Sequence, residues 1–161
     1  MARALLVGCG CRGRMLGSGL IADGWAVRGT SRGAALTDIA AAGIEAVAAD
    51  PDRLGTVTDL IGDVTVLGWL LGAADAEVNG PRLESLLEKL VDSPVRGLLY
   101  EARGTVGEPV LTAGAERVEA WGERFRVPVA ILRADPGDAE AWATAAQAAV
   151  NDLLRPPPVS G

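Results

Sequence analysis

The chain has 161 residues, of which 49% are hydrophobic and 22% charged, so it is long enough to bury the core of one domain but too short for a second, substrate-binding domain. Its formal net charge of -6 argues against a nucleic acid or an anionic membrane as the main partner, because both attract concentrated positive charge. It contains no histidine, which excludes a histidine-based catalytic triad and a histidine-ligated metal site within one chain.

The first 32 residues have the pattern of a strand, a glycine-rich turn, a helix and a second strand. An apolar run over residues 4–7 precedes the turn, a helix is predicted over residues 12–23, and a strand over residues 25–30. The turn contains Gly8, Gly10 and Gly13. Glycines at this place let the backbone approach a pyrophosphate at a helix N-terminus, so the segment predicts a dinucleotide-binding βαβ unit. The alternative is a glycine turn that arose by coincidence in a glycine-rich chain.

The rest of the chain continues the alternation of strands and helices. Helices are predicted over residues 34–42, 52–61, 81–91, 111–125 and 138–154, and strands over residues 44–49, 64–71, 96–101 and 127–133. This rhythm predicts an α/β fold: a single Rossmann-like doubly wound parallel sheet in the order 3-2-1-4-5-6, with helices on both faces. We expect this domain to cover residues 1–154, and residues 155–161 to form a disordered tail. A ligand should bind where the strand order reverses, at the carboxyl ends of strands 1 and 4.

The tip of the second predicted strand indicates which dinucleotide is preferred. Thr30, Ser31 and Arg32 offer two hydroxyls and a cation, and no carboxylate is expected there to repel a phosphate. The sequence therefore predicts NADP(H), with NAD(H) as the other possibility. The alternative for Arg32 is an exposed side chain without a ligand.

Further cofactor-binding candidates surround the predicted crevice. Cys11 and Arg12 belong to the phosphate loop, where Arg12 would be favoured by a bound polyanion and otherwise extends into solvent. Asp50 follows the third strand, where it could reach an adenine amino group or cap a helix. Gly68 and Trp69 lie near the end of the fourth strand, where the backbone should pass under the nicotinamide ribose; Trp69 could line that pocket or belong to the core.

Cysteine content and hydropathy indicate a soluble cytoplasmic protein. Cys9 and Cys11 are the only cysteines, too few for a disulfide framework. In the phosphate loop their thiol pKa could be lowered, or they could simply be small residues that fit. No metal site is expected, and no apolar run is long enough to span a bilayer.

The N-terminal run LLVGCGCRG, together with GWAVRGTSR at residues 24–32, resembles the start of an atypical extended short-chain dehydrogenase/reductase of the NAD-dependent epimerase/dehydratase-like kind. The segments LLY at residues 98–100 and VPVAILR at residues 127–133 are similar to that family's fifth and sixth strands. The resemblance implies a Rossmann fold, a nicotinamide cofactor, and a homodimer through helices 81–91 and 111–125, with Trp121 or Phe125 as anchors.

The catalytic motif of that family is missing. Its enzymes use a serine after strand 5 and a Tyr-x-x-x-Lys pair on the next helix, whose expected positions hold Leu111 and Ala115. We therefore expect a dinucleotide-binding protein without standard short-chain dehydrogenase catalysis, acting as a redox sensor or regulatory subunit. The alternatives are a small NADPH-dependent reductase for flavin- or quinone-type acceptors and a non-catalytic interaction protein. For the reductase, the catalytic candidates are Tyr100, Glu101 and Arg103.

Overall fold

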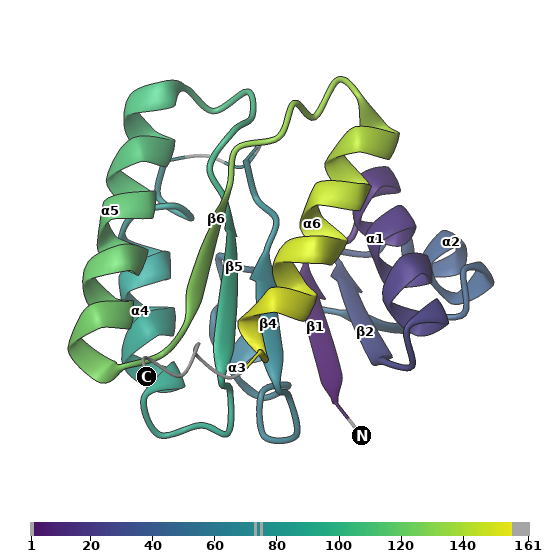
Figure 1. The fold of residues 1–161 in the computed structure, drawn as a ribbon, viewed down its shortest axis with the longest axis horizontal. Coiled ribbons are helices and arrows are strands. Elements are labelled where there is room, and N and C mark those ends of the chain that lie inside the picture. Colours follow the sequence, from purple (N-terminus) through teal and green to yellow (C-terminus); the bar gives the residue numbers. More distant parts are fainter. Residues whose placement is uncertain (1, 73, 75, 156–161) are drawn as a thin grey trace, which may run out of the picture.

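The computed structural model describes residues 2–72, 74 and 76–155 of the chain as a sheet covered by helices on both faces (Figure 1). All neighbouring strands are parallel, in the order β3-β2-β1-β4-β5-β6. The strands are β1 (Arg3–Val7), β2 (Ala26–Ser31), β3 (Glu45–Ala48), β4 (Val66–Trp69), β5 (Gly97–Glu101) and β6 (Val129–Leu132). The predicted fold class and strand order are confirmed. The predicted tail falls, from residue 156 onward, outside the described residues.

Two separate cores lie on the two faces of the sheet. On one face pack α1 (Cys11–Ala22), α2 (Leu36–Ala41) and α6 (Ala139–Leu153). On the other face pack α3 (Gly55–Thr58), α4 (Pro81–Leu90) and α5 (Glu108–Phe125). Figure 1 shows α1 and α6 side by side, so the last helix of the chain lies next to the first. Among the described residues, no helix is long and apolar enough to cross a membrane.

The alternation of side chains along β5 determines which groups reach the crevice. β5 is buried on both faces, as strands of parallel sheets covered by helices on both sides commonly are. Leu98 and Tyr100 belong to the core under α4 and α5, whereas Leu99 belongs to the core under α1 and α6. Because successive side chains point to opposite faces, Glu101 at the end of the strand turns toward α6. Tyr100 and Glu101 are therefore adjacent in sequence but point to opposite faces of the sheet.

The helix predicted over residues 52–61 is wrong in extent, because only Gly55–Thr58 are helical. Polar side chains before it and in its first turn form competing local hydrogen bonds. The Thr56 hydroxyl donates to the carbonyls of Asp50 and Arg53 and accepts the amide of Asp50 at 2.8 Å, and the Asp50 carboxylate accepts the amide of Asp52 at 3.0 Å. Such bonds hold the backbone in turns, which is why Asp, Ser and Thr favour loops over helix interiors.

Candidate functional site

The glycine turn between β1 and α1 brings backbone close to β4 and leaves one side open. Gly8 has φ +86°, and a Cβ there would lie 2.6 Å from the carbonyl oxygen of Leu70, so both the conformation and the space require glycine. A Cβ on Gly13 would contact the Cys9 sulfur at 3.4 Å. A Cβ on Gly10, in contrast, would meet no atom within 4 Å. The turn is therefore closed at Gly8 and open at Gly10.

The N-terminus of α1 opens onto this turn without a side-chain cap. Gly10 is its N-cap residue and has no side chain to accept the first amides, and the first turn contains no acidic residue. A helix N-terminus carries partial positive charge and unsatisfied N–H groups. This end of α1 is therefore suited to bind an anion.

A cavity of 120 Å³ lies at this helix end. It is lined by residues from four parts of the chain: Gly8, Gly10, Cys11, Arg12, Gly13, Leu70, Glu101 and Trp142. Arg12 lies over the Trp142 ring, with its guanidinium carbon 5.6 Å from the ring centroid. The Nε of Arg12 is buried and has no hydrogen-bond partner within the described part of the chain. Arg12 is thus half-buried over Trp142 and lines the cavity, so the alternative that it extends into solvent is wrong.

Glu101 brings a buried carboxylate to the same cavity. Only 3% of the residue is exposed; Oε1 accepts the Gly72 amide at 2.9 Å, and Oε2 accepts the Trp142 indole N–H at 3.1 Å. Burial raises the pKa of Glu101, whereas the Gly72 amide, the charge of Arg12 and the Trp142 N–H act to lower it. The fold thus holds the Glu101 carboxyl beside the glycine turn, where burial disfavours its ionised form.

The two cysteines of the turn differ in environment. Cys9 is buried against Gly29, and burial raises the pKa of its thiol to about 11, so the expectation of a lowered thiol pKa is wrong for Cys9. Its role is packing. Cys11 is exposed and lines the cavity. In the described part of the chain, no group of three potential metal-ligating side chains comes together.

The hydroxyls at the end of β2 support the local backbone. Thr30 is buried, and its Oγ1 accepts the amide of Gly8 at 3.3 Å, which ties β2 to the glycine turn. The Ser31 hydroxyl accepts the amides of Gly33 and Ala35 at 3.2 and 3.3 Å. Both hydroxyls are therefore already engaged as acceptors.

The prediction that no carboxylate lies near Arg32 is wrong. The Arg32 side chain is 60% exposed, and its Nε lies 3.5 Å from a carboxylate oxygen of Asp50, while its Nη2 lies 3.6 Å from one of Asp52. Parallel pairing of β2 with β3 places Ser31 opposite Ala48, which brings the residues that follow the two strands together. Asp50 does not cap α3, whose N-cap is Leu54, so the capping alternative for Asp50 is wrong as well.

The β4 candidates lie inside the sheet. Trp69 is fully buried in the core with α4 and α5, as its core alternative predicts, so we do not place it in the site. Gly68 is buried as well, and a Cβ there would lie 3.1 Å from the Leu6 side chain. From this end of the sheet, Leu70 reaches the cavity instead. Leu70 and Trp142 belong to no sequence motif, so they could not be identified from sequence; the packing of the fold brings them to the cavity.

The remaining catalytic candidates do not reach this cavity. Tyr100 is fully buried, donates its hydroxyl to Asn79 Oδ1 at 3.0 Å, and has its pKa raised to about 12, mainly by burial. Arg103 is exposed and lies 3.9 Å from Asp135. It lines a different cavity of 380 Å³ at the carboxyl ends of β5 and β6, together with Arg133.

No protein-family model and no curated protein match the sequence, but solved structures share its fold. UDP-glucose 4-epimerase from Thermotoga maritima, solved with UDP-glucose, superposes with a TM-score of 0.68 at 12% identity over 81% of this chain and 54% of its own. The same enzyme from Thermus thermophilus, in complex with NAD, gives 0.66 at 17% identity over 85% and 59%.

The triphenylmethane reductase of Citrobacter sp., complexed with NADP(H), superposes with a TM-score of 0.61 at 16% identity over 83% of this chain and 49% of its own. This chain therefore spans about half the length of the structures it resembles. At such identities the likeness shows a shared Rossmann-like fold.

Proposed function

We propose that this chain binds a nicotinamide dinucleotide across the carboxyl ends of β1 and β4. The observation that carries the proposal is the 120 Å³ cavity, which is lined by Arg12 and by the uncapped N-terminus of α1. A phosphate group there would accept hydrogen bonds from backbone amides and from a guanidinium, which together form a strong anion site. Gly10 adds no side chain to the approach, and a Cβ there would meet no atom within 4 Å.

The cavity matches the central part of such a ligand. Whole ligand pockets have volumes of about 300–1,000 Å³, so the 120 Å³ cavity would hold the phosphates while the two nucleosides lie on either side. Arg32 and Asp50 would face the adenosine half, and Leu70 and Glu101 the nicotinamide half. When bound, the nicotinamide supplies hydride chemistry. The complexes of the Thermus epimerase with NAD and of the Citrobacter reductase with NADP(H) support this class of ligand.

NADP(H) preference rests on Arg32. Its guanidinium is exposed and available to a 2′-phosphate, but that phosphate would have to displace the contacts with Asp50 and Asp52. The hydroxyls of an NAD ribose would instead donate to the same carboxylates. We propose that Arg32 favours the phosphorylated cofactor, because guanidinium–phosphate pairs are bidentate and strong.

Calorimetry with the full chain tests both proposals. Binding of NADPH and NADH is measured for wild type and Arg32→Ala, with Arg155→Ala as a control that removes an exposed arginine paired with Asp152 on α6. We expect Arg32→Ala to lower the NADPH-to-NADH affinity ratio about tenfold, or about 1.4 kcal/mol. An unchanged ratio contradicts the role of Arg32, and absence of binding to either form contradicts the site itself.

We further propose that the protein acts as a redox sensor or regulatory subunit without standard short-chain dehydrogenase catalysis. Tyr100 is sealed in the core with its pKa raised to about 12, and it is the only tyrosine of the chain. A reductase is the second candidate, favoured by the cavity at the ends of β5 and β6, where Arg103 and Arg133 could bind an anionic acceptor. NADPH oxidation assayed with flavins and quinones separates the two, and sustained turnover would support the reductase.

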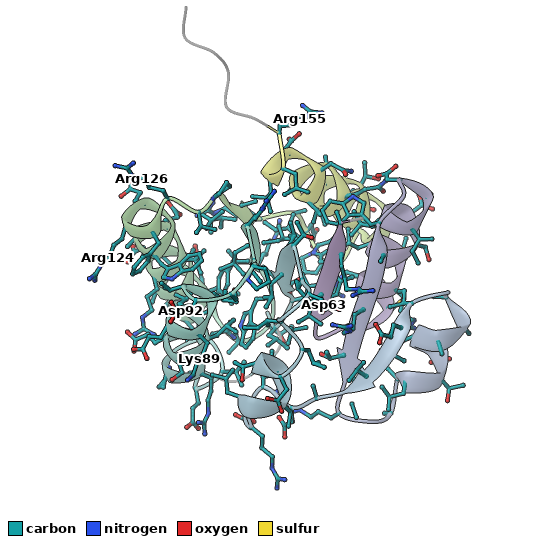
Figure 2. The ribbon with its side chains drawn as sticks, turned by 90° about the horizontal axis from the view of Figure 1, so that it is seen from below. Asp63, Lys89, Asp92, Arg124, Arg126 and Arg155 are labelled. Atoms are coloured by element: carbon teal, nitrogen blue, oxygen red, sulfur yellow. The ribbon has the colours of Figure 1, made fainter. Side chains whose placement is uncertain are left out.

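We also propose a homodimer through α4 and α5. A groove of 660 Å³ between these helices exposes Val91 and Phe125. Its α4 side carries Glu84, Glu88 and Asp92, whereas its α5 side carries Arg117 and Arg124. Figure 2 shows Asp92 and Arg124 on this side of the molecule.

A second copy related by a twofold axis would place the acidic residues on the α4 side of this groove against the arginines on its α5 side. Light scattering of wild type and Phe125→Glu tests this, and a monomeric wild type at micromolar concentration would contradict it.

A further inference from the structure

Glu101 is the one buried carboxylate among the described residues, and the dinucleotide site as proposed does not explain its charge. The other buried polar residues in this part of the chain, Thr30 and Asn79, are neutral. Burying an acid costs free energy unless it is compensated. The groups that donate to Glu101, the Gly72 amide and the Trp142 indole, are also neutral, and no salt bridge to Glu101 occurs within 4.0 Å in the described structure.

The position of Glu101 in the sheet assigns it to one half of a bound dinucleotide. β2 and β3 lie on one side of β1, and β4 and β5 on the other. The adenosine half would lie toward Arg32, at the end of β2, so the nicotinamide half would lie toward the ends of β4 and β5. Glu101 ends β5, and its carboxylate lines the same cavity as the helix N-terminus that would hold the phosphates.

The two redox forms of the ligand differ in charge only at the nicotinamide. The oxidised ring carries one positive charge and the reduced ring is neutral, whereas the phosphates and the adenosine are the same in both forms. A carboxylate held away from bulk water interacts more strongly with a nearby cation than it would in water. Resting on the dinucleotide site proposed above, we propose that Glu101 makes this site select the oxidised form of the cofactor.

Only the ionised carboxylate of Glu101 attracts the oxidised ring, so the preference for the oxidised form should change with pH. Three elements place groups beside Glu101. Helix α1 contributes Arg12, whose charge acts on Glu101, and Cys11, which lines the same cavity. Helix α6 contributes the neutral Trp142, and the loop after β4 contributes the amide of Gly72. Burial raises the pKa of Glu101. The carboxyl is neutral below that pKa and ionised above it, so the preference for the oxidised form should grow as pH rises through it. Binding of the cation should in turn release a proton.

The experiment measures the affinities of the full chain for the oxidised and reduced forms of NAD and NADP by calorimetry. ADP-ribose, which lacks the nicotinamide, reports the rest of the site. We expect wild type to bind the oxidised form about tenfold more tightly than the reduced form, equivalent to about 1.4 kcal/mol. Glu101→Gln should reduce this ratio to about one, and any change in its ADP-ribose affinity measures the effect of the substitution on the rest of the site, which is common to both redox forms and cancels in the ratio. Glu116→Gln, the same charge change on an exposed residue of α5, should leave the ratio unchanged.

The outcomes separate the two proposals. Equal affinity of wild type for both redox forms, or an unchanged ratio in Glu101→Gln, overturns selection by Glu101 and leaves the dinucleotide site standing. Failure of wild type to bind any of the ligands, ADP-ribose included, overturns the site. Should Glu101→Gln fail to fold, the pH series on wild type decides: a ratio that rises with pH supports selection, and a ratio that stays constant over the pH range in which the protein is folded overturns it.

Discussion

Replacing Gly10 with aspartate separates the stability of the fold from anion binding. Gly10 has φ -83° and ψ -158°, an extended conformation that any residue adopts, and a Cβ there would meet no atom within 4 Å. Aspartate is among the preferred N-cap residues because its carboxylate accepts the free amides of the first turn. We therefore expect Gly10→Asp to fold, with its carboxylate placed where the phosphate of a ligand would lie.

The two effects of this substitution have opposite signs. An aspartate N-cap gains a few tenths of a kcal/mol over glycine, and its charge at the positive end of α1 adds about 0.3–1 kcal/mol. The free energy of unfolding should therefore rise by about 0.5–1 kcal/mol. Ligand affinity should fall, because like charges about 4 Å apart repel by about 4 kcal/mol at an effective dielectric constant of about 20. Allowing for screening by solvent, we expect a loss of at least about tenfold.

Gly10→Asn is the matched control, since asparagine has the size and capping ability of aspartate without the charge. Urea denaturation gives the free energy of unfolding of the three proteins, and calorimetry gives their affinities for the oxidised and reduced dinucleotides. We expect Gly10→Asp to bind at least about tenfold more weakly than Gly10→Asn. Equal affinities of the two variants would refute the assignment of a phosphate to the N-terminus of α1. Unfolding of both variants would refute the view that Gly10 faces open space.

Three further predictions concern stability. Gly114→Ala should lower the free energy of unfolding by about 1–3 kcal/mol, because its Cβ would lie 2.0 Å from the Tyr100 hydroxyl, and Tyr100→Phe in the same chain should recover part of the loss in urea denaturation. Asp138→Ala should cost about 1 kcal/mol in the same assay, since the Asp138 carboxylate accepts an amide of the first turn of α6. The hydrogen bond from Arg28 lowers the pKa of Asp63, so Asp63 stabilises the fold above the pKa of the unfolded chain, and the difference in stability between wild type and Asp63→Asn should shrink as pH falls below about 4. A difference independent of pH would show that the Arg28–Asp63 pair does not act through charge.

The sheet order could be predicted because it follows from local patterns and general rules of connection. Apolar runs alternate with helical stripes such as Leu83, Leu86, Leu87 and Leu90, all of which are buried on α4. Right-handed crossovers and a Rossmann-like βαβ start then leave few arrangements for six strands. The ends of the helices were less predictable, as α3 shows, because side-chain hydrogen bonds such as those of Thr56 compete with the backbone hydrogen bonds of the helix.

The residues of the site that could be predicted are those of the glycine turn and Glu101, which was a candidate because it follows the fifth predicted strand. Gly8, Gly10 and Arg12 were identified from sequence because the turn directly follows an apolar strand. Leu70 and Trp142 were not, since Trp142 lies more than a hundred residues away on α6 and only the packing of α6 beside α1 brings it to the cavity. The aspartates beside Arg32 were missed for the same reason, as the register of β3 with β2 places them there.

The charged groups that line the cavity make opposite demands, and one ligand can meet both. The N-terminus of α1 and the charge of Arg12 favour an anion, whereas the ionised Glu101 carboxylate, which lines the same cavity, favours a cation. A simple phosphate satisfies only the first group. A molecule with phosphates at its centre and a cation at one end satisfies both, and an oxidised nicotinamide dinucleotide has this distribution of charge. On the two proposals above, the combination of Arg12 with Glu101 would favour the whole dinucleotide over inorganic phosphate, and the oxidised form over the reduced one.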